Sequence, residues 1–533
     1  MITKTVGVFL LCTLLCCSLF SGCILDQLFG TTFSWTSWEC IDDEGFPSIL
    51  LDCSCSGTVT LELYDPGNAL VDNEFFLRGN HEAVLHLAAF HNPIAPGHYT
   101  LKAYDSNDQN IFEKTFSFNQ GSLTISSVEP YWWKEKGWSD TYSLIGLQMT
   151  VHNTADSPIY PYTIEATVDE KIVHGQILPT SMLQEESNTI DAYLYLEDAS
   201  TSEIMTLTVT DKEGNLLGSG AFPLQVSQVV STTSFNWEYE GTPRRITLPY
   251  PPFLYNYYSS IDRNDIRHED YALYVFDEYD DNYLELFVDQ LQSGLVQSQN
   301  INAVTFAASF VQHLDYKLDS KTNDSFEYPR FPIETLFNGE GGGDCEDKAI
   351  LLAAILDQMG YEAALFRLTG HMAVGVQLDE DATAYDYYID NYYYIETTNE
   401  RSPCGFVPQD YRDKQNLSVY EISSRPLLLQ NWKNGTVSIF KQTELGDFVK
   451  ATVIVKNMGS DAAEDIVIRA AFYNEQGVAF SSETTSIATL PAGSRKKVVL
   501  RADIPPSITT QFKTQIYLDN DLVDERETAS SFP

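Results

Sequence analysis

The residues best placed to do chemistry in this sequence surround Cys345. A glycine loop, residues 341–343, leads through Asp344 into a strongly apolar run that ends at Gly360. We expect this run to be a helix with Asp344 as its N-cap and Asp347, three residues later, completing a capping-box-like start. Cys345 then lies in the first helical turn, where exposed N–H groups and the helix dipole favour a thiolate. It is therefore the candidate nucleophile.

A histidine follows at a spacing that allows it to act as a base. Two strand-like runs, residues 362–368 and 371–378, come after the helix, and His371 begins the second run. Packing of the helix against these strands can set His371 beside Cys345. An adjacent imidazole converts a thiol with an ordinary pKa of about 8.5 into a thiolate–imidazolium pair, and later protonates the leaving group.

A third polar group must fix the tautomer of the imidazole. Residues 385–398 read YDYYIDNYYYIETT, which predicts two tyrosine-rich strands joined at the turn-prone pair Asp390-Asn391. Glu396 then lies on the returning strand beside His371, and we choose it as the third member. Asp390, at the tip of the hairpin, and Asp386 are the alternatives.

The elements that must position these residues occupy residues 262–427, where the pattern changes to helices followed by strands. Apolar residues at i, i+3, i+4 and i+7 mark one helix face between Val304 and Leu314, and residues 283–296 give an earlier helix. Residues 229–261, in which Pro249, Pro251 and Pro252 stand among tyrosines, are expected to form an extended linker.

Three segments of this region resemble the Cys, His and Asp boxes of the transglutaminase-like superfamily. They read GGGDCEDKAILLAAIL, TGHMAVGV and YYYIETT, in the variant with Gly-Asp-Cys-Glu-Asp found in prokaryotic and archaeal transglutaminase-like cysteine peptidases. Residues 328–336 resemble a segment that often precedes the cysteine box in archaeal members. The resemblance implies a papain-like α+β core in which Cys345, His371 and an acid act on peptide or isopeptide bonds.

Two departures from the family pattern refine this expectation. Glu396 stands where most members have Asp, which is tolerable because either carboxylate can accept the imidazole N–H. Glu346 stands where animal cross-linking enzymes have Trp, and no tryptophan lies between Trp237 and Trp432. The resemblance therefore favours hydrolysis over cross-linking, with a peptide or protein of the cell surface or wall as substrate. The alternative is a catalytically inactive module that binds or adheres at the cell surface.

Strand-like alternation dominates the rest of the chain. Residues 33–119 predict a β-sandwich, and residues 120–228 and 428–533 each predict an immunoglobulin-like β-sandwich. The segment VKNMGSD at 455–461 echoes VHNTAD at 151–156, which indicates a diverged repeat of one module. The predicted fold class is multidomain, with a papain-like α+β transglutaminase-like core flanked by all-β immunoglobulin-like sandwiches.

The N-terminus indicates export. Residues 1–23 carry a single charge, Lys4, followed by an apolar run and small residues that lead to Cys23. This pattern is typical of a signal peptide. The ending FSGC resembles the lipobox of prokaryotic lipoproteins, which implies that Cys23 is lipidated and anchors an extracellular, cell-surface protein to the membrane. The alternative is an uncleaved signal anchor or an ordinary signal, which also places the rest of the chain outside the membrane.

Charge and cysteine usage narrow the partners further. A formal charge of −43 makes nucleic acid a poor partner, because affinity for phosphates comes from clustered Lys and Arg. Cys40 is expected to form a disulfide with Cys53 or Cys55 in an exported domain, since a metal site there lacks a fourth ligand and a nearby His. No cofactor is expected, and the sequence gives no prediction of oligomeric state.

Overall fold

A computed structural model describes residues 30–532 apart from 136–140, 202, 262, 264–267, 294, 296–299, 320–327, 340, 379–387, 390, 413–416, 423–425, 444, 460, 507 and 530. The predicted signal peptide over residues 1–23, with Cys23, lies outside the described residues. Within the described ranges, no helix combines the length and the apolar character needed to cross a membrane.

Residues 33–118 form two sheets that enclose one core. The sheet orders are β1-β2-β5 and β4-β3-β6-β7. Val59, Leu61 and Leu63 of β3 are fully buried while the residues between them are half-buried, so one face of the strand lies on the core. The strands are β1 (Phe33–Asp43), β2 (Phe46–Cys55), β3 (Val59–Tyr64), β4 (Leu70–Phe76), β5 (Gly79–His86), β6 (Gly97–Asp105) and β7 (Asn110–Phe118).

The disulfide expected in this unit is not formed. Cys40 and Cys53 are unbridged, and the Cys55 thiol donates a hydrogen bond to the carbonyl of Leu77 at 3.1 Å. The register of β1 against β2 places Cys40 opposite Ile49, four residues away from Cys53 along β2. A strand rises about 3.3 Å per residue, so Cys40 and Cys53 are too far apart to form a disulfide unless β1 slips against β2.

Residues 123–229 form a single eight-stranded sheet, in the order β14-β13-β10-β11-β12-β9-β8-β15, where the sequence predicts a sandwich. The sheet curls so that β14 packs closely against β8. A Cβ added to Gly218 of β14 would lie 2.6 Å from the carbonyl oxygen of Leu123 of β8. The strands are β8 (Leu123–Trp133), β9 (Tyr142–Asn153), β10 (Thr163–Val168), β11 (Lys171–Ile177), β12 (Ser187–Ala199), β13 (Ile204–Thr210), β14 (Leu216–Pro223) and β15 (Gln228–Val229).

The central part of the chain holds the α-helices and a five-stranded antiparallel sheet of order β22-β23-β21-β20-β24. Its helical elements are α3 (Pro252–Ser260), η1 (His268–Tyr274), α4 (Asp281–Ser293), α5 (Asn300–His313), α6 (Pro332–Phe337), α7 (Cys345–Gln358) and η2 (Gln409–Tyr411). Its strands are β16 (Thr232–Tyr239), β17 (Thr242–Pro249), β18 (Asp315–Tyr316), β19 (Gly342–Gly343), β20 (Ala363–Leu368), β21 (His371–Val376), β22 (Tyr388–Ile389), β23 (Tyr392–Ile395) and β24 (Ser418–Ile422).

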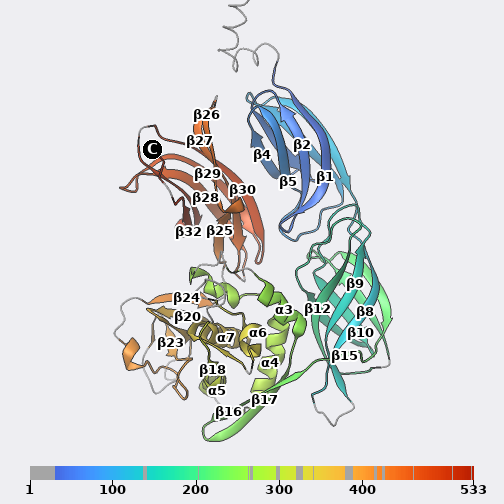
Figure 1. Cartoon of the computed structure of the whole chain (residues 1–533), viewed down its shortest axis with the longest axis vertical. Coiled ribbons are helices and arrows are strands. Elements are labelled where there is room, and N and C mark those ends of the chain that lie inside the picture. The colour runs from blue at the N-terminus through green and yellow to red at the C-terminus, as the bar shows by residue number, and fades with distance from the viewer. Residues whose placement is uncertain are drawn as a thin grey trace, which may run out of the picture.

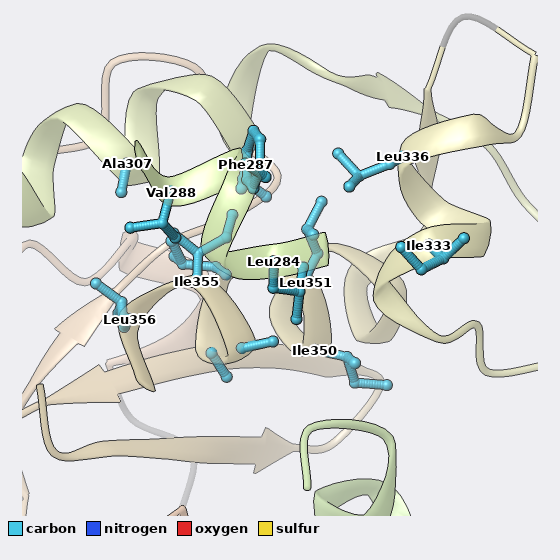
Figure 2. Packing of buried hydrophobic residues seen from close by; sticks show 14 of the residues in the cluster. Leu284, Phe287, Val288, Ala307, Ile333, Leu336, Ile350, Leu351, Ile355 and Leu356 are labelled. Carbon is cyan, nitrogen blue, oxygen red and sulfur yellow. The ribbon is translucent and has the colours of Figure 1, made fainter. Parts of the chain in front are cut away.

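Helix α7 is the centre of this part. All residues from Ala349 to Leu356 have zero exposure, so the helix is buried on every side rather than along one stripe. Figure 2 shows Leu351 and Ile355 of α7 among Leu284, Phe287 and Val288 of α4, with side chains of α5 and α6 nearby. This packing fixes the position of the helix end at which Cys345 stands.

The predicted fold class is wrong for this chain. Strands make up 54% of the structure and helices 14%, so the whole is mostly β, without a clear helical papain-like core. The core around α7 also includes Trp133 and Tyr193 of the preceding sheet and Phe235 and Trp237 of β16. The helices therefore do not pack a self-contained unit, because strands from outside residues 262–427 complete their core.

The expected extended linker over residues 229–261 is also replaced by regular structure. Residues 232–249 form the β16–β17 hairpin, and residues 252–260 form α3. Pro252 is the first residue of α3, a position where the missing N–H of proline is not needed by the helix. Pro252, one of the prolines that suggested an extended chain, therefore begins a helix.

The last part of the chain forms two facing four-stranded sheets. One has the order β25-β27-β26 with β30 also on β27, and the other has the order β29-β28-β31-β32. The elements are β25 (Leu428–Trp432), η3 (Lys433–Gly435), β26 (Ser438–Thr443), β27 (Gly446–Asn457), β28 (Ala463–Tyr473), β29 (Ala479–Leu490), β30 (Arg495–Asp503), β31 (Gln511–Leu518) and β32 (Asp521–Glu527).

The repeated motif at 151–156 and 455–461 makes the same contacts in both places. Asn153 and Asn457 are both fully buried at the ends of β9 and β27. Each side-chain amide donates to the carbonyl four residues later, at 2.8 and 2.7 Å respectively. Each side-chain carbonyl accepts from the amide two residues later. The shared asparagine therefore closes the same turn in both units.

Ion pairs join the first and last parts of the chain, which lie side by side in Figure 1. The Lys433 ammonium lies 2.6 Å from the carboxylate of Asp43, and Lys497 lies 2.8 Å from Asp72. All the cations come from the last part and all the anions from the first. Charge complementarity thus helps to hold the two ends of this acidic chain together.

Candidate active site

The glycine loop brings the start of α7 against β18. Gly342 has a φ of +132°, and a Cβ there would lie 2.2 Å from the carbonyl oxygen of Asp315. A Cβ on Gly343 would meet the Asp347 carboxylate at 2.3 Å. Only glycine permits both approaches, so the loop fixes where Cys345, the first residue of α7, begins the helix.

Asp347 clamps this helix start to the segment before it. Its carboxylate accepts a hydrogen bond from the amide of Asp344 at 3.3 Å and another from the amide of Arg330 at 2.8 Å. The Arg330 guanidinium also bonds Asp347 and lies 2.8 Å from Asp319. Burial raises the pKa of Asp347 to about 7, although Arg330 acts in the opposite direction. The predicted capping residue is therefore part of a buried ion-pair cluster.

His371 is the first residue of β21, as predicted, and it is almost enclosed. Its Nε2 lies 3.0 Å from Oε2 of Glu396, and its side chain has an exposure of 4%. The ring of Tyr411 stacks on the imidazole with centroids 4.2 Å apart and planes 6° apart. The carboxylate and the stacked ring together fix both the orientation and the plane of the imidazole.

Glu396 follows β23 directly and is fully buried. Its Oε1 accepts hydrogen bonds from the amide of Thr397 at 3.1 Å and from the amide and hydroxyl of Thr398 at 2.9 and 2.6 Å. Its Oε2 accepts the Tyr394 hydroxyl at 2.8 Å as well as His371. Burial alone would raise the pKa of Glu396, but the bonds from His371 and Thr398 lower it to about 2. Glu396 is therefore a carboxylate at neutral pH.

The Cys345 thiol lies at the start of β21. It accepts a hydrogen bond from the amide of Met372, the residue after His371. It donates to Oε2 of Glu346 at 3.3 Å. Burial and the Glu346 carboxylate raise the pKa of the Cys345 thiol to about 12, which is opposite to the effect that we expected from the helix end. The helix terminus is outweighed here because the thiol is desolvated and faces an anion.

The structure thus joins His371 to Glu396 and places the Cys345 thiol against the amide of Met372, the residue after His371. Asp386 and Asp390, the alternatives for the third member, lie outside the described residues. Tyr394 and Tyr411 were missed by sequence reasoning. The alternation YYYIE places Tyr394 on the same side as Glu396, which is a signal that could have identified it, whereas nothing in the sequence pairs Tyr411 with His371.

Two further buried residues, neither of them identified from the sequence, bond backbone carbonyls near the site. The Gln312 side chain of α5 donates to the carbonyls of Glu396 at 2.8 Å and Ser402 at 3.0 Å. The buried Lys348 ammonium donates to the carbonyls of Gln312 at 3.2 Å and Leu314 at 2.8 Å. Lys348 therefore caps the C-terminal end of α5 from within α7, and its pKa falls to about 8 because it is desolvated.

A group of three carboxylates also lies beside Cys345. Ligand oxygens of Asp319, Asp344 and Glu346 lie within 4.8 Å of one another. The Asp319 carboxylate is already paired with Arg330. Two of its members, Glu346 and Asp344, add to the desolvation that raises the pKa of Cys345.

Comparison with known proteins gives distant similarities in structure. No family model matches the chain, and no curated protein matches its sequence. The chain is similar to red sea bream transglutaminase at 11% identity, over 72% of this chain and 80% of that chain, with a TM-score of 0.18. It is similar to an exo-chitosanase of Amycolatopsis orientalis at 10% identity, over 91% and 76% of the two chains, with a TM-score of 0.16.

A β-glycosidase from Bacteroides vulgatus is also similar, at 11% identity over 37% of this chain and 25% of that chain, with a TM-score of 0.12. All three structures are of enzymes. Transglutaminase and glycosidases appear together, so the comparisons do not single out a papain-like core. At these scores the likeness carries no argument about the chemistry of this chain.

Proposed function

We propose that this chain is a thiol-dependent amide hydrolase or acyltransferase that uses Cys345, His371 and Glu396. One observation supports this proposal above all others: His371 and Glu396 share an enclosed hydrogen bond, and the amide of Met372, the next residue after His371, donates to the Cys345 thiol. A nucleophile, a base and a group that orients the base are the parts required for covalent acyl transfer.

The geometry assigns a role to each nitrogen of His371. Because Nε2 is engaged by Glu396, Nδ1 is the nitrogen that would accept the thiol proton. The resulting thiolate attacks the carbonyl carbon of an amide, and its oxygen takes the negative charge. The imidazolium then gives its proton to the departing amine, which leaves a thioester on Cys345. Water or a second amine releases the acyl group by the same steps in reverse.

The resting thiol must first leave Glu346. Its S–H now points to that carboxylate, so turning the proton to Nδ1 of His371 starts the reaction. The amide of Cys345, at the first position of α7, is one of the helix N–H groups without a partner in its own helix, and it is a suitable donor for the developing oxyanion.

Hydrolysis is the better supported outcome for the acyl intermediate. The indole N–H of Trp237 is engaged elsewhere, since it donates to the Ser309 hydroxyl of α5 at 3.2 Å. It therefore does not act at Cys345, and Glu346 takes the place beside the thiol where the resemblance would lead one to expect an indole.

A non-catalytic binding module is the second candidate, and one observation favours it. The Glu346 hydrogen bond and the raised pKa of Cys345 together describe a protonated, poorly nucleophilic thiol. A chain with this arrangement and no route for the proton to His371 would bind peptides without cleaving them.

We further propose that the protein acts at the cell surface on peptides or proteins, held to the membrane by a lipid on Cys23. This part follows from the N-terminal sequence. Metabolic labelling with a fatty-acid probe in a bacterial or archaeal host, with Cys23→Ser as the control, tests it. Label that persists in Cys23→Ser would contradict it.

The activity is tested with reduced, unfolded casein as a general substrate. New amino termini identified by mass spectrometry, absent with Cys345→Ala, would establish hydrolysis. Incorporation of a fluorescent primary amine into casein would identify transfer instead. If neither product forms while casein still binds, the second candidate is correct.

A further inference from the structure

One edge of the β16–β17 hairpin has unpaired hydrogen-bonding groups. A two-residue turn, Glu240 and Gly241 with φ of +49° and +73°, sets Tyr239 opposite Thr242. In such a hairpin the pair flanking the turn is hydrogen-bonded, and bonded and non-bonded pairs alternate along the strands. The even-numbered residues of β16 therefore direct their N–H and C=O groups away from β17.

The two outer edges of this hairpin differ. The partners of the even-numbered residues are the odd-numbered residues of β17, which include Pro243 and Pro249. Proline has no N–H and protects a strand edge from further pairing. The outward positions of β16 are Thr232, Ser234, Asn236 and Glu238, none of which is proline. Within the described parts of the chain, β16 pairs with β17 alone.

A groove lies along this edge. A cavity of about 450 Å³ is lined by residues 232–237 together with the end of α5 and Asp315. A second cavity, of about 440 Å³, is lined by residues 238–241, Gln312 and residues 400–403. His313 belongs to both, so the two cavities follow the whole length of β16. An extended chain that entered this groove would lie at hydrogen-bonding range of the edge.

Two residues of the groove belong to elements that also support the proposed catalytic site. Asp315 on its wall belongs to β18, which pairs with β19 directly before Cys345. Gln312 on its floor holds the carbonyl of Glu396. A segment seated in the groove is thereby held by the same elements that position the nucleophile and the acid.

The charged residues that line the two cavities indicate what kind of chain the groove would bind. Glu238, Glu240, Glu400 and Asp315 line the two cavities, against Arg401 and His313. Glu238 and Glu400 already lie 3.1 Å from Arg401 and 3.6 Å from His313, so Glu240 and Asp315 are the exposed carboxylates of the lining that can meet an incoming cation. A second copy of this chain carries a formal charge of −43 and would be repelled.

We infer that the free edge of β16 binds an extended segment of a protein substrate that carries basic side chains, by adding it as a strand to the hairpin. This inference rests on the proposed function for its purpose, since the groove would retain a substrate close to Cys345. The binding itself does not require catalysis.

Binding is tested on the full chain with Cys345→Ala, so that no chemistry interferes. The probe is a fluorescein-labelled peptide of alternating lysine and threonine, followed by fluorescence anisotropy. Asn236→Pro removes one outward N–H from β16, and Thr247→Pro is the matched control on the edge that already has prolines. We expect Asn236→Pro to weaken binding about fivefold to tenfold, the value of one or two hydrogen bonds, and Thr247→Pro to have no effect.

Two further probes separate strand addition from simple charge attraction. The same peptide with N-methyl groups on alternate residues keeps its charge but cannot pair with an edge, so its binding should be lost. A glutamate–threonine peptide should not bind. Equal binding of the N-methylated peptide, equal effects of the two proline variants, or dimerisation through this edge in sedimentation would overturn the inference.

Failure of the groove and failure of the catalytic proposal give different results. Asn236→Pro in the chain with Cys345 intact should react with iodoacetamide at the unsubstituted rate, because none of the contacts described for Cys345, His371 and Glu396 involves Asn236. Unchanged peptide affinity with normal thiol reactivity contradicts the groove alone, whereas an unreactive thiol with normal peptide affinity contradicts the catalytic proposal alone. Thermal unfolding of both proline variants verifies that the hairpin is folded.

Discussion

Nε2 of His371 and Oε2 of Glu396 lie 3.0 Å apart, with side-chain exposures of 4% and 0%. This pair is held from both sides, because Thr397 and Thr398 saturate the other carboxylate oxygen and Tyr411 covers the ring. An imidazole held in this way is expected to carry its proton on Nε2, which leaves Nδ1 as the nitrogen proposed to accept the thiol proton.

Glu396→Gln should therefore abolish most of the activity without unfolding the site. Donors from Thr397 and Thr398 converge on Oε1, so the amide oxygen must occupy that place and the NH₂ group must face His371. Nε2 would then accept a hydrogen bond and Nδ1 would carry the proton. We expect a loss of roughly ten-thousand-fold in turnover, as for the corresponding change in other triads. The exposed Glu362→Gln is the control, and similar turnover in both variants would refute the tautomer argument.

Glu346→Gln should make Cys345 more reactive. The Glu346 carboxylate accepts the S–H and raises the pKa of Cys345, so removing its charge lowers that pKa. A decrease of one pKa unit gives about tenfold more thiolate at neutral pH. The rate of iodoacetamide labelling at pH 7 measures this directly. A rate that stays at the wild-type value would mean that burial alone suppresses the thiol.

Arg330→Met should strongly destabilise the centre of the chain. Asp347 is fully buried, and loss of its guanidinium partner leaves an uncompensated charge that costs about 3–5 kcal/mol. Arg401→Met breaks the exposed pair with Glu238 and should cost about 0–1 kcal/mol. Urea unfolding followed by tryptophan fluorescence compares the two. Equal midpoints would show that the Arg330 pair does not stabilise the helix start.

Stability should be greatest at mildly acidic pH. Burial raises the pKa of Asp281 and Asp347 to about 7, whereas these carboxyls titrate near about 3.9 when unfolded. Between about pH 4 and 7 the unfolded chain releases protons that the folded chain retains, so stability falls as pH rises through this window. Glu396 acts in the opposite sense, since its lowered pKa adds stability that is lost as pH falls toward about 2.

The midpoint of thermal unfolding, measured from pH 4 to pH 8, tests this expectation. Asp281→Asn removes one of the responsible carboxyls and should reduce the slope. An unfolding midpoint that increases from pH 4 to pH 7 would show that other groups dominate.

Several elements could be predicted from the sequence because the signal was local. The periodic apolar residues from Val304 to Val311 lie in α5, which ends one residue before Leu314, and the helix expected at 283–296 is α4, which spans Asp281–Ser293. His371 begins β21 as the run of apolar residues indicated. The matching Asn153 and Asn457 turns could be found because one side chain closes each turn by itself.

The fold class could not be predicted, because it depends on contacts between distant segments. Trp133, Tyr193 and Trp237 complete the core around α7, and no local pattern reveals this. The raised pKa of the Cys345 thiol has a similar origin. A helix start favours an anion when it is exposed, and only tertiary structure places the thiol under cover next to the Glu346 carboxylate. The disulfide expected at Cys40 failed for the same reason, since strand register decides which cysteines meet.

The most direct test of the account is the pH dependence of Cys345 labelling by limiting iodoacetamide in the wild type, Cys345→Ala and His371→Ala. Burial and Glu346 raise the pKa of the resting thiol to about 12, so labelling of the wild type at neutral pH should be slow, and it should slow several-fold further in His371→Ala, which lacks the proposed acceptor of the thiol proton. A labelling rate that is unchanged without His371 at every pH would show that the imidazole does not act on the thiol and would contradict the proposed pair.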